Sequence, residues 1–210
     1  MKSIDSSVST FLDELAARTP TPGGGSASAL GGALGTALGS MAAGFTMGEK
    51  YKAVAPQITA LIEQLGALRR RFTELIELDI DAYGGYSAAR ALPKETAEQK
   101  TARAQAIAAA LEKSTAIPER IVDTAVEAFG VIEQLSSVAN PNLAGDVAVA
   151  AYFLEAAARG AGIQVFSNCA LNDTEGRNAA RRAAIAMKLS LCQAARERID
   201  QAVLKMMKIA

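Results

Sequence analysis

The sequence predicts an all-α protein, a single-domain bundle of long antiparallel helices. Alanine and leucine are the most frequent of its 210 residues, and apolar residues recur at intervals of three and four. The alternation of apolar and polar residues that is typical of strands is almost absent. A chain of this length suffices for one domain with a substantial core, so we expect residues 1–210 to form a single domain.

The first half of the chain predicts three helices before a capping box. Residues 7–17 form an amphipathic helix, which ends at a proline-rich stretch. A second helix is expected from residue 25 or 26 to about residue 47. A third, long helix is expected from about residue 56 toward residue 90, because large apolar residues recur there with helical spacing.

The second half begins with a capping-box signature, since Thr96 is followed three residues later by Gln99. Pro118 is expected to start a new helix, because proline is favoured in a first helical turn. The helices expected here are 96–113, one from Pro118, one at about 142–159 and one at about 175–208. One face of the last helix is expected to present Ala184, Met187, Leu191 and Ala195.

An uncharged run extends from Arg18 to Glu49 and is long enough to raise the possibility of a membrane span. Its residues are mostly Gly, Ala, Ser and Thr, it opens with a proline and glycine loop, and no positive flank orients it, so a buried central helix fits better. Gly31, Gly35 and Gly39 are four residues apart, which predicts a nearly bare helix face and very close helix packing, with a dimer contact as one possibility.

The charge and residue content exclude several classes of function. The 22 basic and 22 acidic residues cancel, so neither nucleic acid nor a membrane surface is expected as a partner. The polar N-terminus lacks the apolar core of a secretory signal, and a cytoplasmic location is expected. Cys169 and Cys192 are expected to be buried thiols, because their number and spacing fit neither a disulfide framework nor a zinc site.

The absence of histidine removes the commonest proton shuttle near neutral pH and the commonest imidazole ligand of zinc. No metal site is expected. Any acid or base must come from a carboxylate, a lysine, a tyrosine or a cysteine, and burial is the expected means of adjusting its pKa.

A glycine loop directly precedes the second helix. Unpaired backbone amides and the helix dipole at such a position can bind an anion or the polar edge of a ring. The loop lacks the lysine of a phosphate-binding Walker motif and the spacing of a dinucleotide-binding fingerprint. A tight turn without a ligand is the alternative. The expected substrate-binding residues in this loop are Pro22, Gly23, Gly24, Gly25 and Ser26.

Several segments together resemble one known family. They are PTPGGGSASAL at 20–30, MGEKY at 47–51, LDIDAY at 78–83, ARALPKET at 89–96 and NPNLAGDVAVAA at 140–151. The combination resembles the formiminotetrahydrofolate cyclodeaminase and methenyltetrahydrofolate cyclohydrolase family. This resemblance implies a helical homodimer that binds the pterin and aminobenzoyl parts of a tetrahydrofolate derivative in a cleft. It also implies chemistry at the carbon that joins N5 and N10, without a metal or redox cofactor.

Three residues are the candidates for acid–base chemistry. Lys50 follows the apolar helix, where partial burial would lower its pKa, and a solvated lysine at a helix end is the alternative. Asp79 or Asp81 should face inward from the long helix, near the cationic carbon of the substrate. Asp146 lies where a later helix begins, and complementing the helix dipole is its alternative role. The catalytic residues expected are Lys50, Asp79 and Asp146.

Further polar residues are candidates for substrate binding. Arg90 and Lys94 flank the ALP turn and suit the glutamate tail of a folate, although solvated surface charge is equally compatible. Asn168 is expected to bond the pterin edge or, alternatively, to satisfy helix ends. Tyr83 and Asn140 complete the set.

Three functions remain open from the sequence. The first is hydrolysis of 5,10-methenyltetrahydrofolate to 10-formyltetrahydrofolate, favoured because no formiminotransferase domain accompanies the helices. The second is a cyclodeaminase reaction on formiminotetrahydrofolate with release of ammonia. The third is a protein without catalysis that binds folate or assembles through its glycine face.

Overall fold

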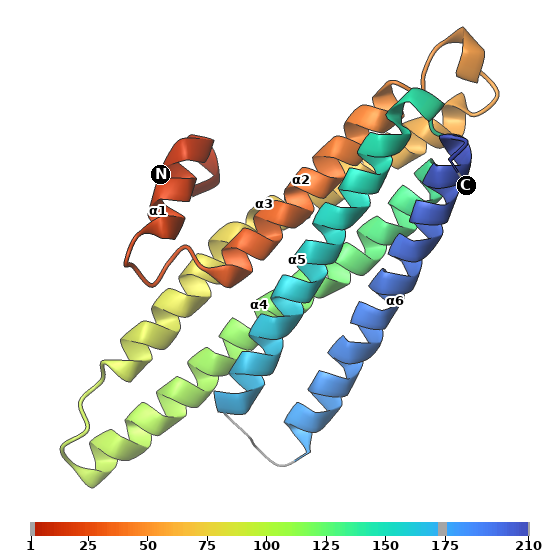
Figure 1. Cartoon of the computed structure of the whole chain (residues 1–210). Coiled ribbons are helices and arrows are strands. Elements are labelled where there is room, and N and C mark those ends of the chain that lie inside the picture. Colours follow the sequence, from red (N-terminus) through yellow and green to blue (C-terminus); the bar gives the residue numbers. More distant parts are fainter. Residues whose placement is uncertain (1–2, 172–175, 210) are drawn as a thin grey trace.

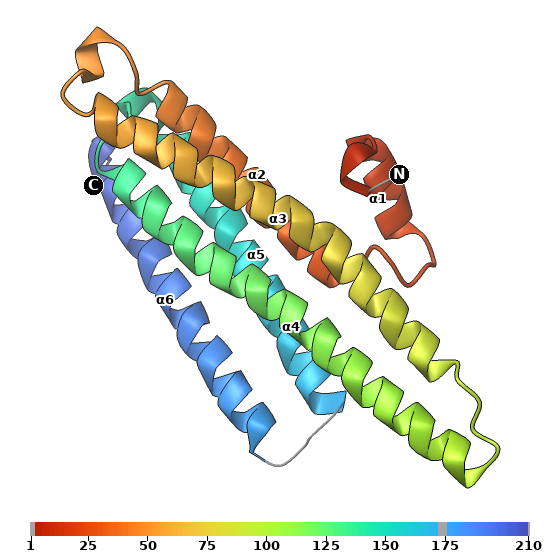
Figure 2. The same cartoon turned by 180° about the vertical axis from the view of Figure 1, so that it is seen from behind.

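The computed structural model describes residues 3–171 and 176–209, and these residues form a bundle of α-helices without a strand (Figures 1 and 2). The all-α prediction is therefore confirmed. Short 3-10 turns lie at Ser3–Asp5, Glu49–Tyr51 and Pro141–Leu143. The α-helices are α1 (Val8–Ala16), α2 (Gly24–Gly44), α3 (Ala55–Arg90), α4 (Ala97–Ser136), α5 (Ala144–Leu171) and α6 (Arg177–Met206).

The long helices α2 to α6 run alternately up and down the bundle, so successive helices are antiparallel (Figure 1). α2 packs against α3 and α5, and α4 packs against α3, α5 and α6. α3 and α4 continue together as a hairpin beyond the other helices, and the short α1 stands at the side of the bundle (Figures 1 and 2). The N-terminal segment is tied to α3 by the Ile4 amide, which donates to Glu77 Oε1 at 3.0 Å.

The glycine face of α2 packs closely, as the sequence predicts, but its partners belong to the same chain. A Cβ atom on Gly35 would lie 2.8 Å from the Ala150 carbonyl oxygen of α5. A Cβ atom on Gly39 would collide with the Ile132 side chain of α4. The dimer contact considered for this face is therefore not available at Gly35 and Gly39, which are buried inside the bundle.

α4 corrects the prediction that a new helix begins at Pro118. Residues 97–136 form one continuous helix with Pro118 inside it. Proline lacks the N–H that would bond the carbonyl four residues earlier, which is that of Ser114. The Asn168 side-chain amide of α5 donates to this carbonyl instead, at 3.1 Å. At the start of the helix the capping box of Thr96 and Gln99 is confirmed by both of its hydrogen bonds.

The last two helices also differ from the prediction. α5 continues to Leu171 instead of ending near residue 159. The expected start of the last helix at residue 175 lies outside the described residues. Its expected apolar face is wrong in part, because Met187 is 62% exposed and Leu191 is 53% exposed, while Ala195 is buried. The side chains that α6 buries against the bundle are Ile185, Cys192, Ala195, Ile199 and Val203.

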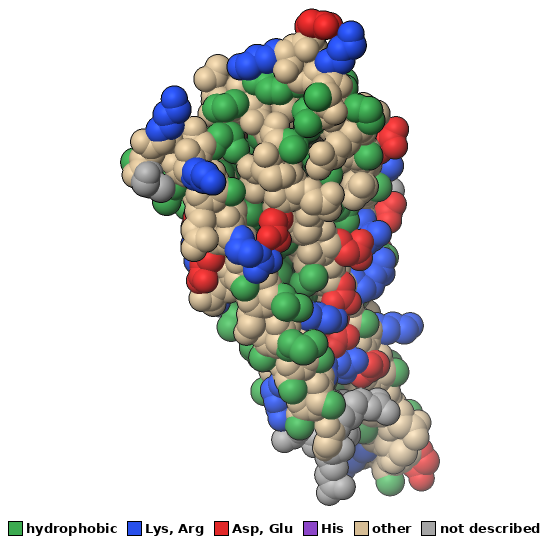
Figure 3. Space-filling model, turned by 90° about the vertical axis from the view of Figure 1, so that its right-hand side faces the viewer, with side chains coloured by type: hydrophobic (Ala, Val, Ile, Leu, Met, Phe, Trp, Pro, Cys, Tyr) green, Lys and Arg blue, Asp and Glu red, His purple; other side chains and the backbone are tan. Residues whose placement is uncertain are grey.

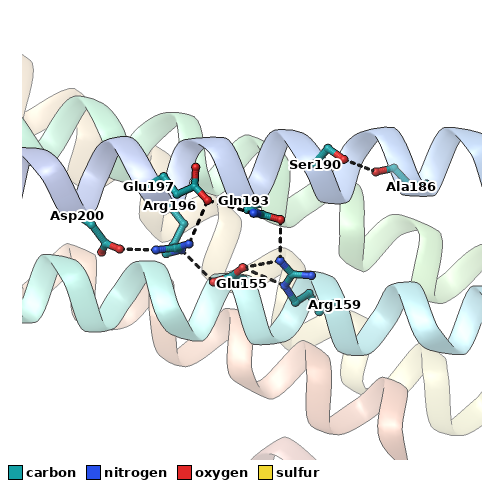
Figure 4. Close-up of polar contacts among 8 residues, drawn as sticks. All are labelled: Glu155, Arg159, Ala186, Ser190, Gln193, Arg196, Glu197 and Asp200. Carbon is teal, nitrogen blue, oxygen red and sulfur yellow. Dashed lines mark hydrogen bonds and ion pairs between the residues drawn. The ribbon is translucent and has the colours of Figure 1, made fainter.

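Ion pairs help to hold α6 against its neighbours. Arg198 Nε donates to Glu133 Oε1 of α4 at 2.5 Å, and Arg196 Nε lies 3.2 Å from Glu155 Oε2 of α5 (Figure 4). Basic and acidic side chains alternate along one edge of the face shown in Figure 3. The Arg196–Glu155 pair is half-buried, whereas an exposed pair such as Arg198–Glu133 contributes about 0–1 kcal/mol. The buried apolar residues therefore dominate the attachment of α6.

Both cysteines are buried, as predicted, and both are free thiols. Cys169 lies on α5 and Cys192 on α6. No helix within residues 3–171 and 176–209 is long and apolar enough to cross a membrane.

Candidate functional site

A pocket of about 380 Å³ lies where the N-terminus of α2 meets α3, α4 and α5. Its size falls in the range of small-molecule sites, which are about 300–1,000 Å³. The glycine loop forms one wall, and the second half of α3 forms another. The lining residues are Pro20, Thr21, Gly23, Gly24, Gly25, Asp79, Tyr83, Tyr86, Arg90, Leu111, Ser114, Pro118, Gln164, Ser167, Asn168 and Leu171.

Four side chains of α3 form a stripe along the pocket. Asp79, Tyr83, Tyr86 and Arg90 are spaced by four, three and four residues, so they share one face of the helix. The rings of Tyr83 and Tyr86 meet edge to face, with their centroids 6.1 Å apart and their planes at 62°. The Arg90 guanidinium carbon lies 5.9 Å from the centroid of the Tyr86 ring. The stripe thus leads from a carboxylate, past two aromatic rings, to a cation.

Asp79 is fixed at the N-terminus of α2 by Ser26. Asp79 Oδ2 accepts from the Ser26 backbone amide at 2.8 Å and from Ser26 Oγ at 2.7 Å. The N-cap residue Gly23 has no side chain to bond these amides, so Asp79 of α3 takes over the role of a capping residue. The helix dipole favours a negative charge at this place.

Burial raises the pKa of the Asp79 carboxyl above its ordinary value, although the two bonds from Ser26 act in the opposite direction. Asp79 Oδ1 carries none of the bonds to Ser26. It lies where a Cβ atom on Gly25 would be, so only glycine fits at residue 25 without moving the carboxylate. A carboxylate with a raised pKa at the edge of a pocket suits the transfer of a proton.

α5 supplies the opposite wall through Gln164 and Asn168, which are four residues apart and share a face. Asn168 Nδ2 donates one hydrogen bond to the Ser114 carbonyl, so its Oδ1 atom and its second N–H can bond a ligand. Ser114 Oγ in turn donates to the Ala82 carbonyl at 3.0 Å, which ties α4 to α3 beside the pocket.

The predicted site residues therefore fall into two groups. The pocket brings together eight of the thirteen, if Ser26 is included through its bonds to Asp79. Ser26 itself is fully buried and lies behind the carboxylate, and Pro22 is buried behind the loop. Of the two acids on the long helix, Asp79 faces inward and Asp81 is exposed, as expected for one of the pair. The eight are Gly23, Gly24, Gly25, Ser26, Asp79, Tyr83, Arg90 and Asn168.

Lys50, Asn140 and Asp146 lie at the other end of the bundle. α2 has 21 residues, which corresponds to about 30 Å between its two ends, and Lys50 follows its far end. Lys50 is exposed, contrary to the expected partial burial. Asn140 joins two connections there, since its Nδ2 atom donates to the Phe45 carbonyl at 3.3 Å. Asp146 is in the first turn of α5. An acidic residue there can complement the helix dipole, which is the alternative role considered for it.

Lys94 is exposed in the connection between α3 and α4, outside the pocket. Among the described residues, no group of three or more His, Cys, Asp or Glu side chains could hold a metal ion. Two lining residues that sequence reasoning missed carried a usable signal. Tyr86 stands three residues after Tyr83, and Gln164 stands four residues before Asn168, so helical spacing places each beside a predicted residue.

Comparison with known proteins gives consistent matches. Residues 7–201 match the model of a family described as formiminotransferase-cyclodeaminase. A methenyltetrahydrofolate cyclohydrolase from Methylorubrum extorquens is 38% identical over 162 residues, which is 77% of this chain and 78% of that protein. A formimidoyltransferase-cyclodeaminase from Rattus norvegicus is 31% identical over 79% of this chain but only 31% of its own length.

A solved structure extends the similarity to the fold. The crystal structure of formiminotetrahydrofolate cyclodeaminase from Thermotoga maritima matches with a TM-score of 0.79 and 26% identity. The match covers 99% of this chain and 98% of that one, so all the helices of the bundle take part in it.

Proposed function

The chain belongs to the formiminotransferase-cyclodeaminase family, and we propose that it hydrolyses 5,10-methenyltetrahydrofolate to 10-formyltetrahydrofolate. The observation that carries the proposal is the Asp79 carboxylate, which Ser26 holds at the edge of the pocket and whose pKa is raised by burial. The similarity to a methenyltetrahydrofolate cyclohydrolase over most of both chains supports this reaction.

The pocket suits the charge distribution of this substrate. From Asp79 to Arg90 the stripe covers 11 helical steps, which is about 16 Å. The cationic bridge between N5 and N10 belongs beside the carboxylate, and the anionic glutamate tail belongs beside the Arg90 guanidinium. Tyr83 and Tyr86 lie between them and offer aromatic faces to the rings of the substrate.

The reaction requires little from the protein, because the carbon between N5 and N10 is already electrophilic. Water attacks this carbon, a C–O bond forms, and Asp79 accepts a proton from the water. The neutral adduct then breaks its bond to N5, which takes a proton, while the hydroxyl loses its proton and the formyl group stays on N10. One proton passes to solvent in total. We propose that no metal or redox cofactor takes part, because the substrate carries its own positive charge.

Lys50 and Asp146 stay predictions as catalytic residues. Neither lines the pocket that contains Asp79, and the steps above use neither. The same holds for Asn140 and Lys94 as substrate-binding residues.

The test is the loss of the near-ultraviolet absorbance of 5,10-methenyltetrahydrofolate on adding the purified protein, pretreated with a chelator. We expect decay well above the buffer rate for the natural protein and decay close to the buffer rate for Asp79→Asn. Asp81→Asn, which changes the exposed acid two residues away, is the matched control and should retain its activity. Decay at the buffer rate with the natural protein would exclude the cyclohydrolase proposal.

A second candidate is the cyclodeaminase reaction, favoured by the structural similarity to the Thermotoga maritima protein. There N10 attacks the formimino carbon of formiminotetrahydrofolate and ammonia leaves, so the same carboxylate can transfer the protons. Release of ammonia from that substrate, without decay of the methenyl compound, would favour this reaction. If the protein binds folate saturably but converts neither substrate, its function would be folate binding without catalysis.

We also propose that the chain acts as a cytoplasmic homodimer. Large apolar side chains are exposed on α2 and α5, and we take four of them as the interface, because exposed apolar patches are typical of one. Phe153→Asp should give a monomer in light scattering, whereas Leu12→Asp, on the exposed side of α1, should not change the mass. The four side chains are Leu34, Val149, Phe153 and Ile163.

A further inference from the structure

Two consecutive glycines at the start of α2 each make room for one side chain from a different helix. Gly25 leaves space for the Asp79 carboxylate of α3, which a Cβ atom would displace. A Cβ atom on Gly24 would lie 2.5 Å from Gln164 Nε2 and 3.2 Å from Gln164 Cδ, so Gly24 leaves space for the amide of α5. Asp79 and Gln164 therefore face the same end of the pocket from opposite walls.

The position of Gln164 follows from the close approach of α5 to α2. One turn before Gln164, Gly160 lies so near Ser28 that a Cβ atom would collide with Ser28 Oγ. Ser28 Oγ is itself held by the Gly24 carbonyl, to which it donates at 2.6 Å. The α5 backbone is thus fixed against the first turns of α2, and Gln164 is directed across Gly24 into the pocket.

The hydrogen-bonding capacity of Gln164 is unused. Its neighbours in the site are partly occupied, since Asp79 Oδ2 accepts from Ser26 and Asn168 Nδ2 donates to the Ser114 carbonyl. Gln164 makes no hydrogen bond within the part of the chain that the structure describes. Its amide has two N–H donors and one carbonyl acceptor, and an amide of this kind can accept a hydrogen from a water molecule and donate to the oxygen of the same molecule.

We propose that Gln164 is a catalytic residue that works opposite Asp79, and this inference rests on the proposed function. The Gln164 carbonyl accepts one hydrogen of the attacking water, and the side-chain N–H donates to the same oxygen as its C–O bond forms. Asp79 takes the proton that the water loses. Because the amide is neutral at every pH of interest, it orients the water and stabilises the adduct oxygen without gaining or losing a proton itself.

The first test compares Gln164→Ala and Gln164→Glu with Gln201→Ala, an exposed glutamine of α6 that serves as the control. Loss of one donor to a developing oxygen typically lowers kcat about 10²-fold, and we expect this for both Gln164 variants. The glutamate variant loses activity because a carboxylate accepts but does not donate. KM for 5,10-methenyltetrahydrofolate and the affinity for 5-formyltetrahydrofolate should each change less than about threefold, since the interaction develops during the reaction.

The second test asks whether the effect of Gln164 depends on the space that Gly24 leaves for its side chain. Gly24→Ala should lower kcat by forcing the amide aside, and it should lower kcat much less in the Gln164→Ala background. Independent effects of the two substitutions would overturn the coupling. A Gln164→Ala variant with more than half of the natural kcat, or with a defect in KM alone, would overturn the assignment while Asp79→Asn still supports the proposed function. A natural protein without turnover of either folate substrate would overturn both.

Discussion

The side-chain amide of Asn168 donates to the backbone carbonyl of Ser114 at 3.1 Å, across the contact between α5 and α4. This carbonyl stands four residues before Pro118, which has no N–H to bond it. Asn168 therefore repairs the break that a proline makes inside α4. Since all three residues line the pocket, the repair also fixes the shape of its wall.

Asn168→Ala should lower the free energy of unfolding by about 1–3 kcal/mol, the cost of leaving a partly buried acceptor without a partner. In a Pro118→Ala background the N–H of residue 118 can bond the Ser114 carbonyl, so the same substitution should cost less. Urea denaturation of the four proteins measures the difference. Equal losses in both backgrounds would contradict this account of Asn168.

The continuation of α4 through Pro118 is the part of the fold that local sequence patterns do not predict. Helical periodicity and the capping box of Thr96 and Gln99 predicted the helices and the start of α4. The sequence predicts that Pro118 begins a helix, because proline is favoured in a first helical turn. The partner that makes it tolerable, Asn168, is 50 positions away in the sequence, and no local pattern shows that the two meet.

Asp79→Asn should make the protein more stable and less active. Burial raises the pKa of the Asp79 carboxyl, so its charged form is disfavoured in the folded protein. An asparagine can still accept the two bonds from Ser26 without a buried charge. We expect a higher melting temperature at pH 7 together with a loss of kcat of about 10²–10⁴-fold. A lower melting temperature would show that the charge is needed to cap α2.

The pH dependence of activity should reflect the same carboxyl. Asp79 must be ionised to accept a proton, so kcat/KM should fall as the pH falls through its raised pKa. Ser26→Ala removes a bond that lowers this pKa, and the acid limb should therefore move to higher pH. A limb that does not move, in a variant that remains folded, would indicate that another group controls it.

The contribution of Asp79 to stability depends on pH in the opposite direction to its contribution to activity. Its folded-state pKa is raised, so its contribution is fully present below the unfolded pKa and is lost as the pH rises through the folded value. Asp79→Asn should abolish this part of the pH dependence. Urea midpoints of the two proteins across the acidic range measure it, and parallel curves would contradict the assignment.

Only the part of the site that lies on one helix face could be predicted from the sequence. Asp79, Tyr83 and Arg90 share a face of one helix, and helical spacing alone places them together. Lys50 and Asp146 are predicted from their places after the apolar helix and at the start of a later helix, and such places give no distance to the other site residues. The length of α2 separates Lys50 from the pocket. This separation becomes evident only when the arrangement of the helices in space is known.

Two glycines inside helices, Gly35 and Gly130, should change the stability of the protein in opposite directions when each is replaced by alanine. Gly35→Ala places a Cβ atom 2.8 Å from the Ala150 carbonyl oxygen and should destabilise the protein, because backbone has to move. Gly130→Ala, in α4 with nothing within 4 Å, should stabilise it by about 0.5–1 kcal/mol. Melting temperatures test both. A neutral Gly35→Ala would show that α2 and α5 are less closely packed.

Arg90→Ala should raise KM about tenfold with little change in kcat, because in the proposed orientation its guanidinium would bind the glutamate tail equally in substrate and transition state. An attraction between exposed charges weakens as salt screens it, so KM of the natural protein should rise with ionic strength. KM of Arg90→Ala should rise less. Arg69→Ala removes an exposed cation of α3 outside the pocket and is the control for a general charge effect. A fall in kcat with an unchanged KM would instead place the reacting carbon at the Arg90 end and reverse the orientation proposed for the substrate.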